Sequence, residues 1–243
     1  MKLPEMLTDL RLAWCNDNHE DLAAEAARKQ WTHHQFLQHL MEGEWNRLHG
    51  SRVTRRLKQA RFPVLKALDQ FDWNWPRKIN RPQIQDLFRL SFLKDKGNVV
   101  FIGGVGTGKT HLATALACEA CQQDHAVLYT SAVDIINTLV GAQATDSLKA
   151  CLKRYTRPEI LLIDELGYLP IDKLGANLLF QVFSLRYERG STLITTNKAF
   201  KHWPDIFNGD VLITAAVLDR VLHHAESVVI EGPSYRMRER KAE

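Results

Sequence analysis

The sequence predicts an α/β fold with a parallel five-stranded sheet flanked by helices, preceded by a small all-helical domain. Five apolar runs of strand length occur after residue 97, namely NVVFI, AVLYT, EILLID, TLITT and SVVIE. Segments long enough for helices separate these runs, as in parallel sheets that are covered on both faces. Before residue 63, apolar residues instead recur at helical spacing.

Composition restricts the class of protein. The 243 residues carry a formal charge of +4, which permits an anionic partner without requiring one. Four cysteines at irregular spacing do not indicate a disulfide framework. Lys2 and Glu5 interrupt any early apolar run, so a signal peptide is not expected. No apolar stretch approaches the roughly 18 residues that a membrane span needs. We therefore expect a cytoplasmic protein without a membrane partner.

Residues 1–62 are expected to form the helical domain. The alanine-rich stretch DLAAEAARKQ has strong helix propensity. After it, Thr32 and Gln35 have the spacing of a capping box, and the residues that follow carry an apolar stripe. A second helix is therefore predicted to begin at this box.

Residues 63–82 predict an extended linker, because prolines at 63, 76 and 82 interrupt them. The linker contains FDWNWP, whose Trp73 and Trp75 either pack on the following domain or stack on adenine or DNA bases. Packing is the favoured interpretation. Residues 83–243 then form the predicted α/β domain.

A glycine-rich loop follows the first apolar run of that domain. It matches the pattern G-x-x-x-x-G-K-[ST] and lies between a predicted strand and a predicted helix. Its glycines let successive backbone N–H groups and the helix N-terminus face phosphate oxygens. Lys109 would reach the β and γ phosphates of ATP, and Thr110 would bind Mg²⁺. The residues expected to contact the nucleotide are Gly103, Gly104, Val105, Gly106, Thr107, Gly108, Lys109, Thr110 and His111.

Two acids end the third apolar run, in EILLIDELGYLP. Asp164 is placed to hold the Mg²⁺ shell, and Glu165 is placed to polarise a water for attack on the γ-phosphate. Two solvated acids at a strand end are the alternative, which the upstream phosphate loop disfavours. The pair therefore predicts an ATPase.

Three further polar residues are candidates for the site. Asn197 follows TLITT and either orients the attacking water or begins a turn. Arg220, on a predicted helix, either forms a surface salt bridge with Asp219 or an earlier acid, or acts as an arginine finger toward the nucleotide of a neighbouring subunit. Arg236, near the end of the sequence, is a second arginine candidate.

Five strings carry a family likeness, in this order: GGVGTGKTHLA, LLIDELGYLP, LLFQVFSLRYERGSTLITTNKAF, VLDRVLHHA and IEGPSYRMR. Together they closely resemble the IstB-like helper ATPases of bacterial transposons, relatives of the DnaC-type helicase loaders in the AAA+ class. The resemblance implies a P-loop AAA+ core. Only about a dozen residues follow SVVIE, so we expect no C-terminal helical lid. The roles it implies are Walker A for Lys109 and Thr110, Walker B for Asp164 and Glu165, sensor 1 for Asn197, arginine finger for Arg220 and a position near sensor 2 for Arg236.

Members of that family bind DNA as ATP-dependent oligomers and pass the target site to a transposase. The resemblance thus implies three partners: double-stranded DNA bound largely without regard to sequence, a transposase, and further copies of the chain. A basic segment without acids, residues 47–66, is consistent with DNA binding. On a helix, Val53, Leu57 and Ala60 would face inward and Arg52, Arg55 and Arg56 outward. The residues expected to contact DNA phosphates are Arg52, Arg55, Arg56 and Lys58.

Other functions share parts of this pattern. For the basic segment itself, a solvated face or an intersubunit contact is the alternative. A helicase loader has every ATPase motif and differs in its partner surface. A P-loop small-molecule kinase would transfer phosphate to a hydroxyl, but Glu165 and the candidate finger Arg220 argue against it. A non-hydrolysing scaffold would use ATP only to hold copies together on DNA.

Two motifs are not assigned to the ATP site. Cys118 and Cys121 form a C-x-x-C without a second pair, so packing in a helix is expected. Two adjacent histidine pairs occur, at residues 33–34 and 223–224. On a helix the two side chains of such a pair point about 100° apart, which does not favour a shared metal.

Overall fold

The computed structural model describes residues 2–237, and its chain divides into two compact units, 1–55 and 56–243. The domain boundaries predicted at residues 62 and 82 stay predictions. Among the described residues, every helix is too short or too polar to cross a lipid bilayer.

The first unit is built from helices, as the sequence predicts. The capping box is confirmed, because the Thr32 N–H donates to Gln35 Oε1 at 2.8 Å and the Gln35 N–H donates to Thr32 Oγ1 at 3.3 Å. Trp14 lies so close to Gly43 that a Cβ there would come within 2.2 Å of its ring. The helices are α1 (Leu3–Asp9), α2 (Ala13–Lys29) and α3 (His33–Ala60), of which α3 ends in the second unit.

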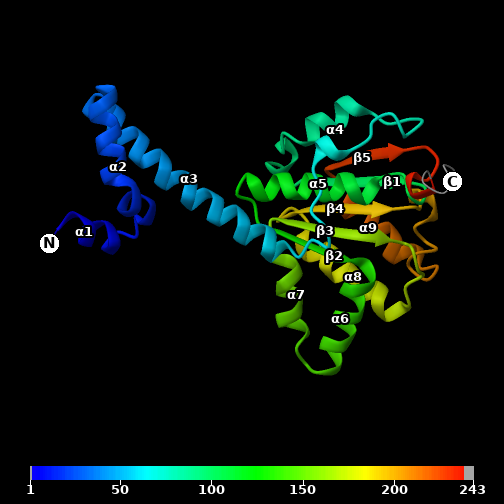
Figure 1. Ribbon diagram of the computed structural model, residues 1–243. Coiled ribbons are helices and arrows are strands. Elements are labelled where there is room, and N and C mark those ends of the chain that lie inside the picture. Colours follow the sequence, from blue (N-terminus) through cyan, green and yellow to red (C-terminus); the bar gives the residue numbers. More distant parts are fainter. Residues whose placement is uncertain (1, 238–243) are drawn as a thin grey trace. The chain divides into compact units, whose positions relative to one another are not determined.

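The second unit contains a five-stranded sheet in which all neighbouring strands are parallel (Figure 1). In space the order is β2-β3-β4-β1-β5. The predicted α/β class and the parallel five-stranded sheet are therefore confirmed. The strands are β1 (Asn98–Gly103), β2 (Val127–Ser131), β3 (Ile160–Leu166), β4 (Ser191–Thr196) and β5 (Ala225–Ile230).

Helices cover this sheet, and several of them begin at polar caps. Ser131, Asp172 and Asp210 each accept a hydrogen bond from a backbone N–H of the helix that they start, which satisfies a donor that has no partner within the helix. The helices are α4 (Arg81–Leu87), α5 (Lys109–Gln122), α6 (Ala132–Ala144), α7 (Leu148–Thr156), α8 (Lys173–Arg186) and α9 (Val211–Leu222). Short 3-10 turns are η1 (Leu68–Gln70), η2 (Ser91–Leu93), η3 (Phe200–His202) and η4 (Tyr235–Met237).

Two buried clusters lie on the two faces of the sheet. Alternate residues of a strand point to opposite faces, so Val99 and Phe101 join one cluster while Val100 joins the other. The first cluster includes Leu112 and Leu116 of α5. The second includes Ile135 of α6, Leu179 of α8 and Val217 of α9. Both faces are thus apolar, and polar function is left to the ends of the strands.

The linker packs on the α/β unit, as expected. Phe71 is 8% exposed, and its ring meets that of Trp73 edge to face, with centroids 5.0 Å apart. Trp75 donates from Nε1 to the Pro233 carbonyl at 3.0 Å. These contacts fix the linker beside the glycine-rich loop, because a Cβ at Gly108 would lie 2.6 Å from the Phe71 ring.

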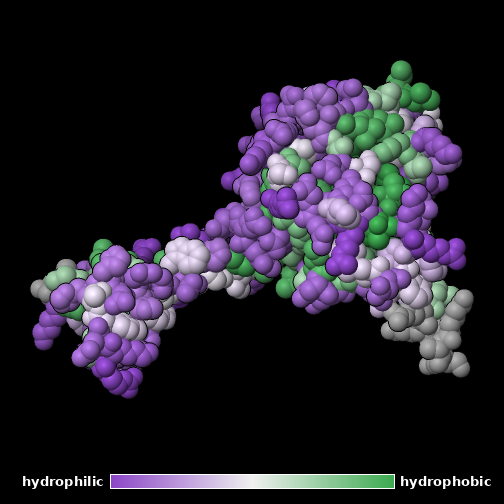
Figure 2. Space-filling view, turned by 90° about the horizontal axis from the view of Figure 1, so that it is seen from above, coloured by the Kyte–Doolittle hydropathy of each residue, from purple (hydrophilic) through white to green (hydrophobic). Residues whose placement is uncertain are grey.

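Apolar side chains also reach the surface of the second unit, where Figure 2 shows hydrophobic patches among mostly hydrophilic residues. Val211 and Leu212, at the start of α9, are 67% and 83% exposed. Tyr168 and Leu169, in the loop after β3, are 64% and 54% exposed. Neighbouring exposed apolar residues of this kind are typical of contact surfaces.

Candidate functional site

The order of the strands brings three loops together. Because β4 lies between β1 and β3, the carboxyl ends of these three strands meet at one edge of the sheet. The glycine-rich loop follows β1, Asp164 and Glu165 end β3, and Asn197 follows β4. Ligands of open α/β sheets bind at such an edge.

The glycine-rich loop is held in a curled conformation. Gly106 and Gly108 have φ values of +73° and +98°, in the region that favours glycine. Thr107 Oγ1 donates to the Gly104 carbonyl at 2.9 Å, and Lys109 Nζ donates to the same carbonyl at 2.6 Å. α5 begins at Lys109, so its N-terminus faces the hollow of the loop.

We expect Gly106→Ala to weaken ATP binding by about tenfold or more, since a left-handed conformation costs roughly 1–2 kcal/mol for a residue with a Cβ. The new Cβ would also lie 2.1 Å from Ser234 Oγ, so the loop would have to move. Gly209→Ala is the matched control, because Gly209 has φ +74° but no neighbour within 4 Å of its Cβ position. Calorimetric titration measures the ATP affinity of both variants. Equal affinities of Gly106→Ala and Gly209→Ala for ATP would contradict the expectation.

Asp164 accepts hydrogen bonds from three hydroxyl groups and is 4% exposed. Thr110 Oγ1 lies 2.9 Å and Thr195 Oγ1 2.5 Å from Asp164 Oδ1, and the Tyr129 hydroxyl lies 2.8 Å from Oδ2. Burial, reinforced by the negative charge of Asp164, raises the pKa of Tyr129. Tyr129 therefore stays a hydrogen-bond donor that fixes this carboxylate.

Glu165 lies in a local irregularity of β3. Its φ is +60°, which is uncommon for a residue with a side chain, and the pairing register with β4 shifts between Ile163 and Leu166. The Glu165 N–H donates to Thr195 Oγ1 at 3.0 Å, which holds the irregularity in place. The exposed Glu165 side chain consequently lines the cavity beside the loop.

That cavity has a volume of about 690 Å³, within the usual range for small-molecule sites. The sequence interpretation missed part of its wall, since Phe71 of the linker and Tyr235 of η4 also line it. Trp75, for which stacking on adenine is the alternative, lines it as well. It missed Tyr129 and Thr195 as well, although polar residues inside otherwise apolar strands are a signal that could have identified them. The predicted residues that line the cavity are Val105, Gly106, Thr107, Gly108, Lys109, Thr110, His111, Glu165, Asn197 and Arg236.

Arg236 lines the cavity from η4. It follows β5 in η4, where the Tyr235 N–H donates to the Gly106 carbonyl at 2.8 Å. Burial lowers the pKa of Lys109, the charge of Arg236 acts in the same direction, and Asp164 opposes both. Two cations therefore face the same hollow, which suits an anionic ligand with several phosphates.

His111 lies in the first turn of α5, as expected, and is fixed by the linker. Its Nε2 lies 3.0 Å from the Ala67 carbonyl, and its ring meets that of Phe71 edge to face. Burial lowers the pKa of His111, which keeps the ring neutral near pH 7.

The model of the family described as IstB-like ATP binding proteins matches residues 5–243. The chain belongs to this family. It is 37% identical over 240 residues to the ATP-binding protein of insertion sequence IS21 from Pseudomonas aeruginosa, which covers 99% of this chain and 90% of that protein. It is 43% identical over 183 residues to the corresponding protein of insertion sequence IS232 from Bacillus thuringiensis, covering 75% and 73%.

Solved structures confirm the AAA+ fold. The DnaC helicase loader superposes with a TM-score of 0.56 at 19% identity, covering 68% of this chain and 96% of that chain. A replication initiator, DnaA bound to AMPPCP and single-stranded DNA, gives 0.56 at 20% identity, over 72% of this chain and 53% of its own. At these identities the likeness concerns the fold alone.

The structure keeps Arg220 away from the cavity beside the glycine-rich loop of its own chain. The side chain is half-buried on α9, donates from Nη1 to the Ala216 carbonyl at 2.8 Å and lies over the Phe180 ring at 5.1 Å. Within residues 2–237 it forms no ion pair with Asp219, so the salt-bridge alternative is not found there. A role toward a neighbouring subunit stays a prediction.

The basic segment on α3 is partly as expected. Arg52, Arg55 and Lys58 are exposed, whereas the outward orientation expected for Arg56 is wrong. The Arg56 side chain is 26% exposed, and its Nε lies 3.1 Å from Asp124 Oδ1, because the turn after α5 supplies an acid that the local sequence did not show. DNA contact by any of these residues stays a prediction.

Proposed function

We propose that this protein is a transposition helper that assembles on duplex DNA when it binds ATP, hydrolyses the ATP, and delivers the DNA to a transposase. The observation that carries the proposal is that Lys109, Thr110 and Glu165 line one cavity, where Thr110 donates a hydrogen bond to Asp164. Membership of a family of insertion-sequence ATP-binding proteins supports the link to transposition.

Binding of the triphosphate would use groups that already face the cavity. The backbone N–H groups of residues 104–109 and the α5 N-terminus would receive phosphate oxygens. Lys109 Nζ, now 2.6 Å from the Gly104 carbonyl, would exchange that bond for the β and γ phosphates. Arg236 would add a second cation from the other side of the loop.

The residues beside the loop fit a magnesium ion. Thr110 Oγ1 and Asp164 Oδ1 are hard oxygen donors 2.9 Å apart at the mouth of the loop, the type of ligand that Mg²⁺ prefers. Bound there with ATP, the ion would neutralise charge on the phosphates. Tyr129 and Thr195 would keep the Asp164 carboxylate oriented toward it.

Hydrolysis would use the two side chains at the ends of β3 and β4. Glu165 would accept the proton of the attacking water, and Asn197 would orient that water. Arg220, placed on another part of the surface, would reach the ATP of the adjacent copy. ATP turnover would then depend on assembly, and the exposed apolar residues at the start of α9 and after β3 would supply contact area between copies.

The experiment that tests this proposal is electron microscopy of the protein with linear duplex DNA, with and without Mg-ATP. We expect ordered oligomers on DNA only with Mg-ATP, because ATP would lie between copies. Particles that stay single and free of DNA in both conditions would contradict the proposal.

DNA binding itself is tested by salt dependence. Removing one phosphate contact, in Arg55→Ala or Lys58→Ala, is expected to weaken binding and to reduce the slope of log K against log salt by about 0.9. Arg28→Ala is the control, since Arg28 is exposed at the end of α2 outside the basic segment. A slope unchanged in both variants would remove the basic segment from the DNA contact.

A helicase loader is the second candidate, favoured by the fold likeness to the DnaC loader. Both functions need the ATP site, so only the identity of the partner protein distinguishes a transposition helper from a helicase loader. Retention of a transposase but not a replicative helicase on the immobilised protein is the result that we expect.

A further inference from the structure

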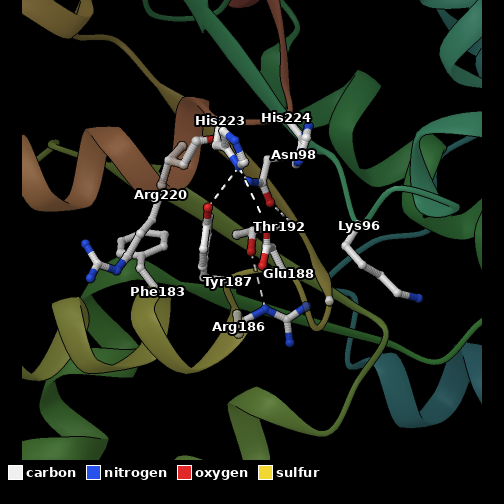
Figure 3. Close-up of a pocket in the computed structure, with 12 residues that line it drawn as sticks. Lys96, Asn98, Phe183, Arg186, Tyr187, Glu188, Thr192, Arg220, His223 and His224 are labelled. Atoms are coloured by element: carbon white, nitrogen blue, oxygen red, sulfur yellow. Dashed lines mark hydrogen bonds and ion pairs between the residues drawn. The ribbon is translucent and has the colours of Figure 1, made fainter.

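Three metal-binding side chains gather outside the ATP site. One ligand atom from each of Glu188, His223 and His224 lies within 4.8 Å of the other two, and all three side chains are exposed (Figure 3). Glu188 follows α8, and the two histidines follow α9. Among residues 2–237 this is the only such group of histidine, cysteine and acidic ligands.

The two histidines meet although they are adjacent in sequence. The expectation that they point about 100° apart assumes a helix, and it is wrong here because α9 ends at Leu222. Both residues lie in the turn between α9 and β5, where their ring centroids are 4.1 Å apart with planes at 46°. The turn therefore presents both imidazoles on the same side.

Two imidazoles and one carboxylate are typical ligands of zinc. Tetrahedral bonds of about 2.0 Å would place ligand atoms about 3.3 Å apart. His223 Nδ1 already lies 3.9 Å from Glu188 Oε1, so closure needs shifts of about an ångström in exposed side chains. The Tyr187 hydroxyl lies 2.9 Å from the same His223 Nδ1, so a metal bound at this nitrogen would take the place of that hydrogen bond.

The surrounding charges permit a cation. Arg220 and Lys96 line the adjoining hollow, but in Figure 3 their charged ends point away from the histidines. Arg186 is buried among backbone carbonyls that receive its hydrogen bonds. The negative charges of Glu188 and Asp219 both act on Tyr187, so acids lie close to the cluster.

We propose that Glu188, His223 and His224 form a binding site for a zinc-like divalent transition metal, with water in the fourth position. The bound ion joins the end of α8 to the end of α9. Arg220 lies one turn before His223 on α9 and packs on Phe180 of α8, so the ion also fixes the two helices that hold this arginine. The site itself does not depend on the proposed ATPase function.

Titration calorimetry of the full, tag-free, metal-free chain with Zn²⁺ tests the proposal. We expect one equivalent to bind, and we expect His223→Ala, His224→Ala and Glu188→Gln each to weaken binding by at least the roughly tenfold that loss of a supporting contact causes. The matched control replaces His33 and His34, an exposed adjacent pair without a third ligand, and is expected to leave the affinity unchanged.

Two further measurements make the result decisive. Zn²⁺ is expected to raise the melting temperature of the wild type but not of Glu188→Gln, whose exposed substitution leaves the folded core intact. The Co²⁺ complex is expected to lack a thiolate charge-transfer band. Absence of zinc binding, wild-type affinity in all three cluster variants, or a thiolate band that assigns the metal to cysteines would each overturn the proposal.

Discussion

Replacing Glu165 by glutamine is expected to slow ATP hydrolysis by roughly 10²–10⁴-fold, the usual contribution of a general base, while ATP still binds. Glutamine keeps the shape of the side chain but cannot accept the proton of the attacking water. The phosphate-binding groups, Lys109 and Thr110, are unchanged in this variant. ATP should therefore stay bound, and on the proposed function the complex with DNA should persist.

Glu159→Gln is the matched control. Glu159 precedes β3 at the opposite end of the same strand and pairs with His125 at 2.6 Å, far along the strand from Glu165. Phosphate release in the presence of DNA measures the rate, and filter binding of labelled ATP measures retention. If Glu165→Gln hydrolyses ATP at the wild-type rate, Glu165 is not the base.

The second large effect concerns stability. Arg186→Met is expected to lower the free energy of unfolding by about 3–5 kcal/mol, because several buried acceptors lose their donor. Arg186 is 2% exposed, and burial lowers its pKa to about 10, so it remains charged at neutral pH. Its guanidinium donates to the Thr192 hydroxyl and to four carbonyls, those of Tyr155, Pro158, Glu159 and Ser191.

Methionine would fill much of the same space but would leave these acceptors without their donor where water cannot reach, and removal of the buried guanidinium charge would offset part of that loss. Arg186→Lys should also destabilise, because an ammonium group has three donors and cannot reproduce the fork of the guanidinium. Arg189→Met, an exposed arginine three residues later, is the control. Urea unfolding measures all three, and equal midpoints would show that the carbonyls find other partners.

Much of the fold is readable from local patterns. All five apolar runs are strands, the capping box at Thr32 forms, and the glycine-rich loop lies between β1 and α5. Each of these features is decided by residues close together in the chain. Spacing along one segment is enough to show which side is buried and where a helix begins.

Contacts between distant segments were not readable in the same way. Tyr129 and Thr195 bond to Asp164 because β2 and β4 are the neighbours of β3, and nothing within either strand reports that order. Arg56 turns inward because the chain after α5 places Asp124 beside it. The linker lines the ATP cavity because Phe71 packs over Gly108.

The amino-acid sequence by itself thus identifies the phosphate loop, the acidic strand end and the family, since each motif consists of a few neighbouring residues. Only the tertiary structure decides which of these groups come into contact. The sheet order brings Thr195 between the loop and the acids, and the end of α9 brings two histidines together beside Glu188. Both outcomes depend on long-range packing and strand pairing, whose free energy is distributed over the whole unit and leaves no mark in any single segment.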